Sequence, residues 1–266
     1  MNGRVRVRRE RPCALSVALA LMITMLCVYL LTLGASLMPE ASIPSSGDAP
    51  RVTEEVAFES AQAYFVALGR FDTAQEARIE AARYIPRGAA GYVVEDGETF
   101  LALGAAYQTE AEAARVAQSL SQTENLTCEV YSQSAERVRL RVTAQEEHIA
   151  AVQNAEALLR ATAAQAAEIA FQLDRAEIDP EAARTLINIA SGRLGDAHEA
   201  LSAIPGAAQN SVCAQLLSLT ERFQASLFVL SGENSKTTLS LSAKIKYNGI
   251  EVALGHMRCL RELNAL

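Results

Sequence analysis

The chain has 266 residues, half of them hydrophobic, no tryptophan and a formal net charge of −7. Five arginines against Glu10 give the first twelve residues a charge of +4, so the remainder carries −11. A surface this acidic repels nucleic acid, anionic lipid headgroups and anionic wall polymers. It excludes nucleic-acid binding and leaves recognition to shape, stacking and local hydrogen bonds.

The N-terminal segment predicts a membrane anchor. After the basic tail of residues 1–12, the 28 residues 12–39 carry no charge. As a helix they span roughly 40 Å, more than the ~30 Å hydrocarbon core of a bilayer. We expect a transmembrane helix over residues 13–38, a cytoplasmic tail and the rest of the chain outside the cytoplasmic membrane, because arginines stay inside. A cleaved secretory signal is the alternative, since Gly34, Ala35 and Ser36 offer a peptidase small residues.

The region after the anchor begins with a linker and an internal repeat. Proline, serine and glycine predict a linker over residues 39–56. Residues 63–71 (AYFVALGRF) then match residues 98–107 (ETFLALGAAY), with Phe65, Leu68 and Gly69 recurring as Phe100, Leu103 and Gly104. Each copy precedes an alanine-rich helical pattern in which a threonine is followed by glutamate three residues on, the spacing of a capping box: Thr73 with Glu76 and Thr109 with Glu112.

Further strands complete a small domain. Residues 91–95 alternate like a strand and are joined to the second copy by the turn pair Asp96-Gly97, which predicts a hairpin. Residues 126–131 and 137–142 give one or two more strands. We therefore expect an α+β fold whose residues 57–144 have the order βαββαβ, an RNP-like antiparallel sheet with a possible extra strand.

The strand pattern also predicts an aromatic platform. If two helices cover one face of the sheet, Val66 and Leu68 point toward them, and alternation turns Phe65, Ala67, Phe100 and Ala102 to the open face. Aromatic rings on an open sheet suit a sugar or a protein partner, and Tyr92 is placed with them. Alternatively, the linker or the C-terminal segment covers these rings.

The repeat resembles the sporulation-related repeat domain of bacteria, the SPOR domain. Its halves each begin with an aromatic and apolar strand ending in Gly-x-Phe and continue into an alanine-rich helix. The residues that carry the resemblance are Tyr64 to Phe71, Ala74, Glu76, Ala77, and more loosely Phe100 to Gly104, Tyr107, Glu112 and Ala113. It spans residues 57–144, about a third of the chain.

The resemblance implies a function. Members of the family bind peptidoglycan, in particular glycan strands stripped of stem peptides at division or sporulation septa, and are often anchored by one N-terminal membrane helix. The implied glycan-binding residues here are Phe65, Ala67, Tyr92, Phe100 and Ala102. The family often has glutamine where Ala67 stands and a polar residue where Ala102 stands, so two alanines remove hydrogen-bonding groups from that face.

Residues 145–266 read as helical. Apolar residues at helical spacing predict one helix ending near Asp174, a second starting at Asp179-Pro180, a third ending at Gly232 and a fourth after it. Short connections favour an antiparallel bundle of about four helices that forms a separate domain. It could bind a protein partner, self-associate or act as a spacer.

No catalytic motif is recognisable in the sequence. Its three histidines, His148, His198 and His256, are far apart and expected to be solvated or capping residues. Cys128, Cys213 and Cys259 are expected to be core thiols, with a Cys213 to Cys259 disulfide as the alternative. We therefore expect no enzyme, no metal and no cofactor.

Two functions remain open. The first is a membrane-anchored, noncatalytic cell-wall protein that binds peptidoglycan during division or sporulation. The second is a membrane-anchored interaction or assembly protein whose SPOR-like domain no longer binds glycan.

Overall fold

The computed structural model describes residues 50–123, 126–233 and 237–265, of which those from Arg51 onward belong to one compact unit. The predicted tail, transmembrane helix, signal cleavage site and most of the linker lie outside the described residues. Within the described residues, no helix has the length and hydropathy needed to cross a membrane. The fold is α+β with antiparallel sheets and six α-helices in the described part of the chain.

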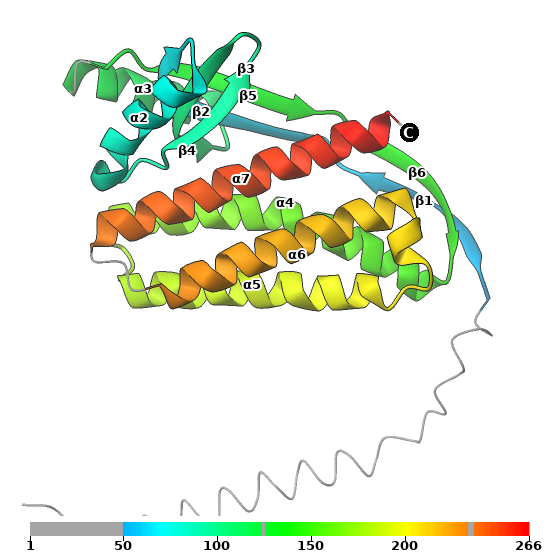
Figure 1. The fold of residues 1–266 in the computed structure, drawn as a ribbon. Helices are drawn as coiled ribbons and strands as arrows, with labels where there is room; N and C mark the ends of the chain where they lie inside the picture. The colour runs from blue at the N-terminus through cyan, green and yellow to red at the C-terminus, as the bar shows by residue number, and fades with distance from the viewer. Residues whose placement is uncertain (1–49, 124–125, 234–236, 266) are drawn as a thin grey trace, which may run out of the picture. The chain divides into compact units, whose positions relative to one another are not determined.

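The predicted βαββαβ order is present. It runs β2 (Ala61–Phe71), α2 (Ala74–Tyr84), β3 (Tyr92–Asp96), β4 (Thr99–Tyr107), α3 (Glu110–Thr123) and β5 (Glu129–Ala135), with a short 3-10 turn at Ile85–Arg87 (Figure 1). The strands form an antiparallel sheet in the order β3-β4-β2-β5. Helices α2 and α3 both pack on one face of it.

Local sequence signals fix the ends of these elements. Thr73 Oγ1 accepts a hydrogen bond from Glu76 N at 3.2 Å, and Thr109 Oγ1 accepts one from Glu112 N at 3.3 Å, so both predicted N-caps are confirmed. Gly97 has φ +63°, a conformation that favours glycine, in the predicted β3–β4 turn. Each cap satisfies one main-chain N–H of the first helical turn.

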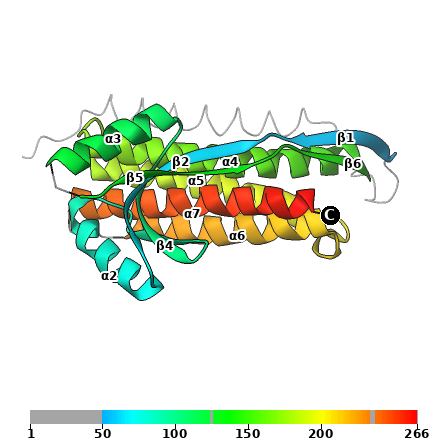
Figure 2. The same ribbon diagram turned by 90° about the horizontal axis from the view of Figure 1, so that it is seen from above.

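A two-stranded arm extends the sheet. Strand β1 (Val52–Phe58) pairs with β6 (Val138–Ala144), and the register from Val52↔Ala144 continues unchanged to Ala67↔Glu129 in the β2–β5 pair. The four strands therefore form one long ladder, interrupted only at residues 59–60 and 136–137. Its β1–β6 end lies along α4 (Figures 1 and 2). The possible extra strand is β6, whereas β1 occupies the end of the predicted linker and was not foreseen.

Four long helices follow, as predicted. They are α4 (Glu146–Asp174), α5 (Pro180–Ser202), α6 (Ser211–Gly232) and α7 (Thr238–Asn264), with a 3-10 turn at Ala207–Gln209. Asp179 caps α5 through Ala182 N at 2.7 Å, and Pro180 is its first residue. Between α5 and α6, Asn188 contacts Ser231 and Ser191 contacts Gln224, so the two helices are antiparallel. Between α4 and α7, Asp174 contacts Lys246 and Glu156 contacts His256, so these two are antiparallel as well.

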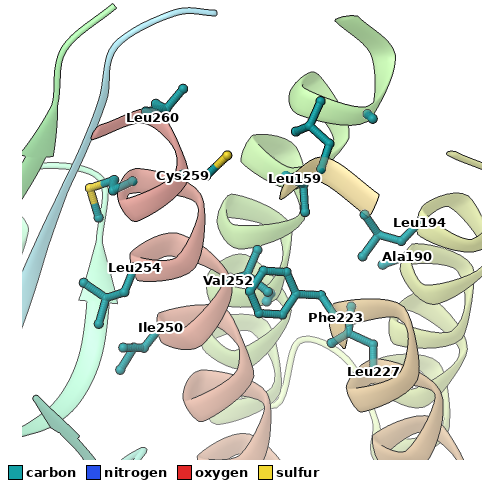
Figure 3. Close-up of a cluster of buried hydrophobic side chains, with 14 of the residues drawn as sticks. Leu159, Ala190, Leu194, Phe223, Leu227, Ile250, Val252, Leu254, Cys259 and Leu260 are labelled. Atoms are coloured by element: carbon teal, nitrogen blue, oxygen red, sulfur yellow. The ribbon is translucent and has the colours of Figure 1, made fainter. Parts of the chain in front are cut away.

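Glycines bring α7 close to its neighbours. The ring of Phe223 on α6 points into the centre of the bundle, where Val252 of α7 meets it (Figure 3). A Cβ added at Gly255 would lie 2.7 Å from Phe223 Cζ, and one at Gly249 would lie 3.1 Å from Ala166 Cβ on α4. Both glycines permit a close approach that a side chain would prevent.

The hydrophobic core is continuous across the predicted domain boundary at residue 145. One cluster of buried side chains joins Phe65 and Leu101 of the sheet to Ile149 of α4 and Ile250 of α7. Independent folding of residues 145–266 stays a prediction, but in the folded chain the sheet and the bundle share their apolar interior.

Candidate functional site

The face of the sheet opposite α2 and α3 is the candidate site predicted from the sequence. Alternation along β2 is as expected: Val66 and Leu68 pack against helix α3, while Phe65 and Ala67 point to the opposite face. Phe65 and Ala67 are both 0% exposed, however. The prediction that this face is open is therefore wrong.

Helix α7 covers this face. Tyr92 of β3 lies against Tyr247 of α7, with ring centroids 5.0 Å apart, and Phe65 lies 6.1 Å from Tyr131 of β5. Figures 1 and 2 show α7 running beside the sheet. The structure therefore contains the alternative arrangement, in which the C-terminal segment covers the sheet face that carries Phe65 and Tyr92.

Polar contacts join α7 to the turn after α2, to α4 and to β5. Near its start, Lys246 Nζ donates to Gly88 O at 2.7 Å and lies 2.5 Å from Asp174 Oδ2. Near its end, Arg261 Nη2 donates to Gln133 Oε1 at 2.9 Å. Burial raises the pKa of Tyr92, and the carboxylate of Glu251 raises it further. These contacts make the α7–sheet interface a specific one.

Phe100 and Ala102 lie on the other face of the sheet. Val66 pairs with Ala105 but Ala67 pairs with Leu103, so Gly104 is an extra residue that forms a β-bulge. The bulge reverses the facing of every earlier residue in β4, which turns Leu101 and Leu103 toward α7. The expectation that Phe100 and Ala102 share a surface with Phe65 is wrong for this reason.

A glycine at position 104 lets the bulge pack closely against Leu68. A Cβ at this position would lie 3.2 Å from the Leu68 side chain, which packs under α3. The five predicted platform residues therefore divide into Phe65, Ala67 and Tyr92 under α7, and Phe100 and Ala102 on the face of α2 and α3. They do not form one binding surface.

A polar cluster that no sequence pattern indicated lies on β2. Arg70 Nη1 donates to Asp96 Oδ2 and to Thr99 Oγ1, each at 2.8 Å, and Arg70 Nε donates to Glu129 Oε1 at 3.1 Å. The hydrogen bond to Asp96 is the main cause that raises the pKa of Arg70. Through Arg70, this cluster ties the β3–β4 hairpin to β5.

Two cavities adjoin the sheet. The larger, of about 500 Å³, lies between α3 and the end of α4. Its wall includes Tyr107, whose ring stacks on Phe171 at 5.1 Å, and burial raises the pKa of this tyrosine to about 12. Lys246 at its rim is held by Asp174. The smaller cavity, of about 280 Å³, lies between the sheet, α4 and α7.

The predicted thiols and histidines have varied surroundings. Cys213 and Cys259 are buried free thiols, as expected, and do not form the alternative disulfide. His256 is 3% exposed and its Nε2 lies 2.9 Å from Glu156 Oε1, so the expectation of a solvated or capping residue is wrong for it. In the part of the chain that the structure describes, His, Cys, Asp and Glu do not gather in threes around a metal position.

Comparison with known proteins adds no relative: no family model, no curated protein and no solved structure matches this chain.

Proposed function

We propose that the chain is a membrane-anchored, noncatalytic interaction or assembly protein, in which the face of the SPOR-like sheet holds α7 in place of a glycan. The anchor rests on the uncharged N-terminal segment and the arginines before it. The observation that carries the proposal is the complete burial of Phe65 and Ala67 beneath the C-terminal helices.

The energetics of that interface support the proposal. Phe65, Leu101 and Leu103 are each 0% exposed on the covered face. Full burial of one such side chain contributes roughly 1.5–3 kcal/mol. A glycan that used this face would first have to expose all three, at a cost of several kcal/mol, and would find alanine at residue 67 where a hydrogen-bonding group would help.

Peptidoglycan binding is the second candidate. The βαββαβ order with its antiparallel sheet favours it, because it is the arrangement that the resemblance to the SPOR domain implies. In this chain a glycan would need either displacement of α7 or a surface outside the aromatic face. The two candidates therefore differ in a measurable property, the binding of the folded chain to denuded glycan.

Cosedimentation with peptidoglycan sacculi separates the candidates. The full chain in detergent is mixed with intact sacculi and with sacculi that an amidase has stripped of stem peptides, beside a domain known to bind denuded glycan. We expect the chain to stay in the supernatant of both. Pelleting that increases after amidase treatment would overturn the proposal and favour the second candidate.

An Arg70→Ala variant identifies the surface if pelleting occurs. Arg70 stands on β2 at 43% side-chain exposure, beyond the part of the sheet that α7 buries. Loss of pelleting in this variant would assign glycan binding to the uncovered end of the sheet. Retention of pelleting together with exposure of Tyr92 to solvent would assign it to a state in which α7 has left.

A further inference from the structure

The smaller cavity lies at a gap in the sheet. Strand β2 continues past the end of β4, whose last pair is Tyr64↔Tyr107, while Ala61–Ala63 pair with β5 on their other edge. Among the described residues, no strand pairs with the β4-side edge of Ala61–Ala63. These residues line the cavity, so main-chain donors and acceptors of that edge border a space of about 280 Å³.

Small side chains on two helices form the opposite wall. Ala163 and Ala167 of α4 face Gly249 and Ala253 of α7 around the cavity. Larger residues at these positions would fill the space by ordinary core packing. The polar side chains of Gln62 and Gln108 complete the lining.

One residue of this wall, His256, belongs to a buried ionisable pair, and its partner Glu156 does not line the cavity. His256 of α7 and Glu156 of α4 are 3% and 4% exposed, and Nε2 donates to Oε1 over 2.9 Å. Arg160 Nε, one turn along α4, lies 4.0 Å from the same carboxylate oxygen. Burying such a pair is costly compared with apolar residues of the same size, so stability alone is a weak reason for its presence.

The second ring nitrogen of His256 is available to a ligand. Among the described residues, His256 Nδ1 makes no hydrogen bond, because the only one on this ring is that of Nε2 to Glu156. Arg160 and His256 both line the cavity. With Nε2 donating to the carboxylate, a neutral imidazole offers Nδ1 as an acceptor, and a protonated one offers it as a donor.

Of the cavity-lining residues that the structure describes, Arg160 is the one lysine or arginine, and it is the group that would bind an anion. It also balances Glu156, so the set is neutral with the neutral imidazole that leaves Nδ1 as an acceptor. Tyr107, which also lines the space, adds no negative charge near neutral pH because burial raises its pKa to about 12. An arginine is the side chain best suited to bind a carboxylate.

We propose that this cavity binds a small organic acid with a hydrogen-bond donor beside its carboxylate, a hydroxy acid or an amino acid. Arg160 binds the carboxylate, and His256 Nδ1 accepts from the neighbouring hydroxyl or ammonium group. Glu156 holds the imidazole in the orientation that makes this possible. The site rests on one part of the proposed function, the position of α7 on the sheet, because Gly249, Ala253 and His256 of this helix line the cavity; it uses none of the five predicted platform residues.

Histidine NMR tests the site on the full chain in detergent. The chain has three histidines, so the imidazole signals of His256 are assigned by elimination with His148→Gln and His198→Gln variants. Glycolate is added at constant ionic strength up to about 100 mM, where a site with a millimolar Kd is filled. Glycolamide, which has the hydroxyl but no charge, is the neutral control.

We expect glycolate to shift the His256 signals along a saturable curve and leave His148 and His198 in place. Arg160→Gln should weaken binding by about tenfold, the effect of losing one charge-assisted hydrogen bond. Ala164→Leu, which narrows the cavity without changing a charge, should abolish glycolate binding. Arg193→Gln, at an exposed arginine on α5 remote from the cavity lining, is the matched control and should have no effect.

Three results would overturn the proposal. One is a His256 signal that stays constant, or moves linearly without saturation, while the spectrum shows a folded chain. Another is an equal response to glycolamide. The third is unchanged glycolate binding in Arg160→Gln, because the assigned carboxylate ligand would then be wrong.

Discussion

The ring of Tyr92 on the edge strand β3 lies against the ring of Tyr247 on α7, 155 residues later in the chain, with centroids 5.0 Å apart and planes inclined at 52°. Tilted aromatic pairs of this kind add to the energy of area burial. The contact joins the first half of the chain to its last helix, and it places an aromatic ring of the protein itself on the sheet face that was predicted to be open.

Removing this contact should weaken the interface. Tyr247→Ala should lower the free energy of unfolding by about 1–2 kcal/mol, because the aromatic pair and the covered part of a side chain that is 41% exposed are lost. Phe228→Ala is the matched control, since this α6 ring is 62% exposed and its loss should cost less than about 0.5 kcal/mol. Urea unfolding followed by circular dichroism gives both values. Equal effects of the two substitutions would show that Tyr247 does not pack on the sheet in solution.

A buried hydroxyl on α7 should be dispensable. Ser242 is 0% exposed, and its Oγ has no hydrogen-bond partner among the described residues. Ser242→Ala removes an unsatisfied polar atom and favours the helix, so we expect a gain of about 1 kcal/mol. By contrast, the hydroxyl of the fully buried Thr220 donates to Leu216 O at 2.9 Å, and Thr220→Val should be destabilising. A loss of stability in Ser242→Ala would mean that the hydroxyl has a partner, such as an internal water.

Two helix glycines should respond oppositely to alanine. Gly192 on α5 has open space where a Cβ would stand, so Gly192→Ala should stabilise the chain by about 0.5–1 kcal/mol through helix propensity. At Gly255 the added Cβ would meet the Phe223 ring at 2.7 Å, and Gly255→Ala should cost about 1–2 kcal/mol through overpacking. Thermal unfolding of the two variants measures the difference. The same sign for both would contradict the close packing of α7 on α6.

Stability should fall at alkaline pH. Burial is the main cause that raises the pKa of Cys259 from 9.0 to about 12 and that of Tyr107 from 10.0 to about 12. The folded chain therefore keeps protons that the unfolded chain releases, so this stability is fully present below pH 9 and is lost as the pH rises from about 9 toward 12. Urea unfolding at several pH values gives the slope of the free energy of unfolding against pH. In a Cys259→Ala, Tyr107→Phe double variant this free energy should fall less steeply between pH 9 and 12. An unchanged slope would refute the assignment of the pH dependence to these two groups.

The local structure of this chain follows from the sequence because its signals are local. Thr73 and Thr109 cap the predicted helices, Asp96-Gly97 makes the predicted turn, and Asp179-Pro180 starts the second bundle helix. Each feature depends on residues within a few positions of one another. The order of strands and helices was predictable for the same reason.

The candidate site was not predictable because it depends on long-range packing and on one inserted residue. Strand alternation placed Phe65 correctly on the face opposite α3, but only the tertiary structure brings α7 onto that face. The second copy of the repeat has one extra residue between Gly104 and Tyr107, but the pattern does not show that a bulge at Gly104 reverses the facing of β4. Strand β1 was missed because its sequence VTEEVAF follows a linker composition and has its partner β6 more than 80 residues later.

The pairing of His256 with Glu156 was also beyond sequence reasoning. The two residues are 100 positions apart on helices whose relative rotation the apolar pattern does not define. A glutamate on the apolar stripe of α4, at a position where the pattern expects a hydrophobic residue, was the one signal that could have indicated it.

The measurement that tests the central claim most directly is an NMR contact between the rings of Tyr92 and Tyr247 in the full chain. The chain has seven tyrosines, so ring signals are assigned with single Tyr→Phe variants in tyrosine-labelled protein. We expect a nuclear Overhauser cross-peak between the two rings, unchanged when soluble denuded glycan fragments are added. Absence of the cross-peak in a folded chain, or its disappearance on addition of glycan, would show that α7 leaves the sheet open and would contradict the account.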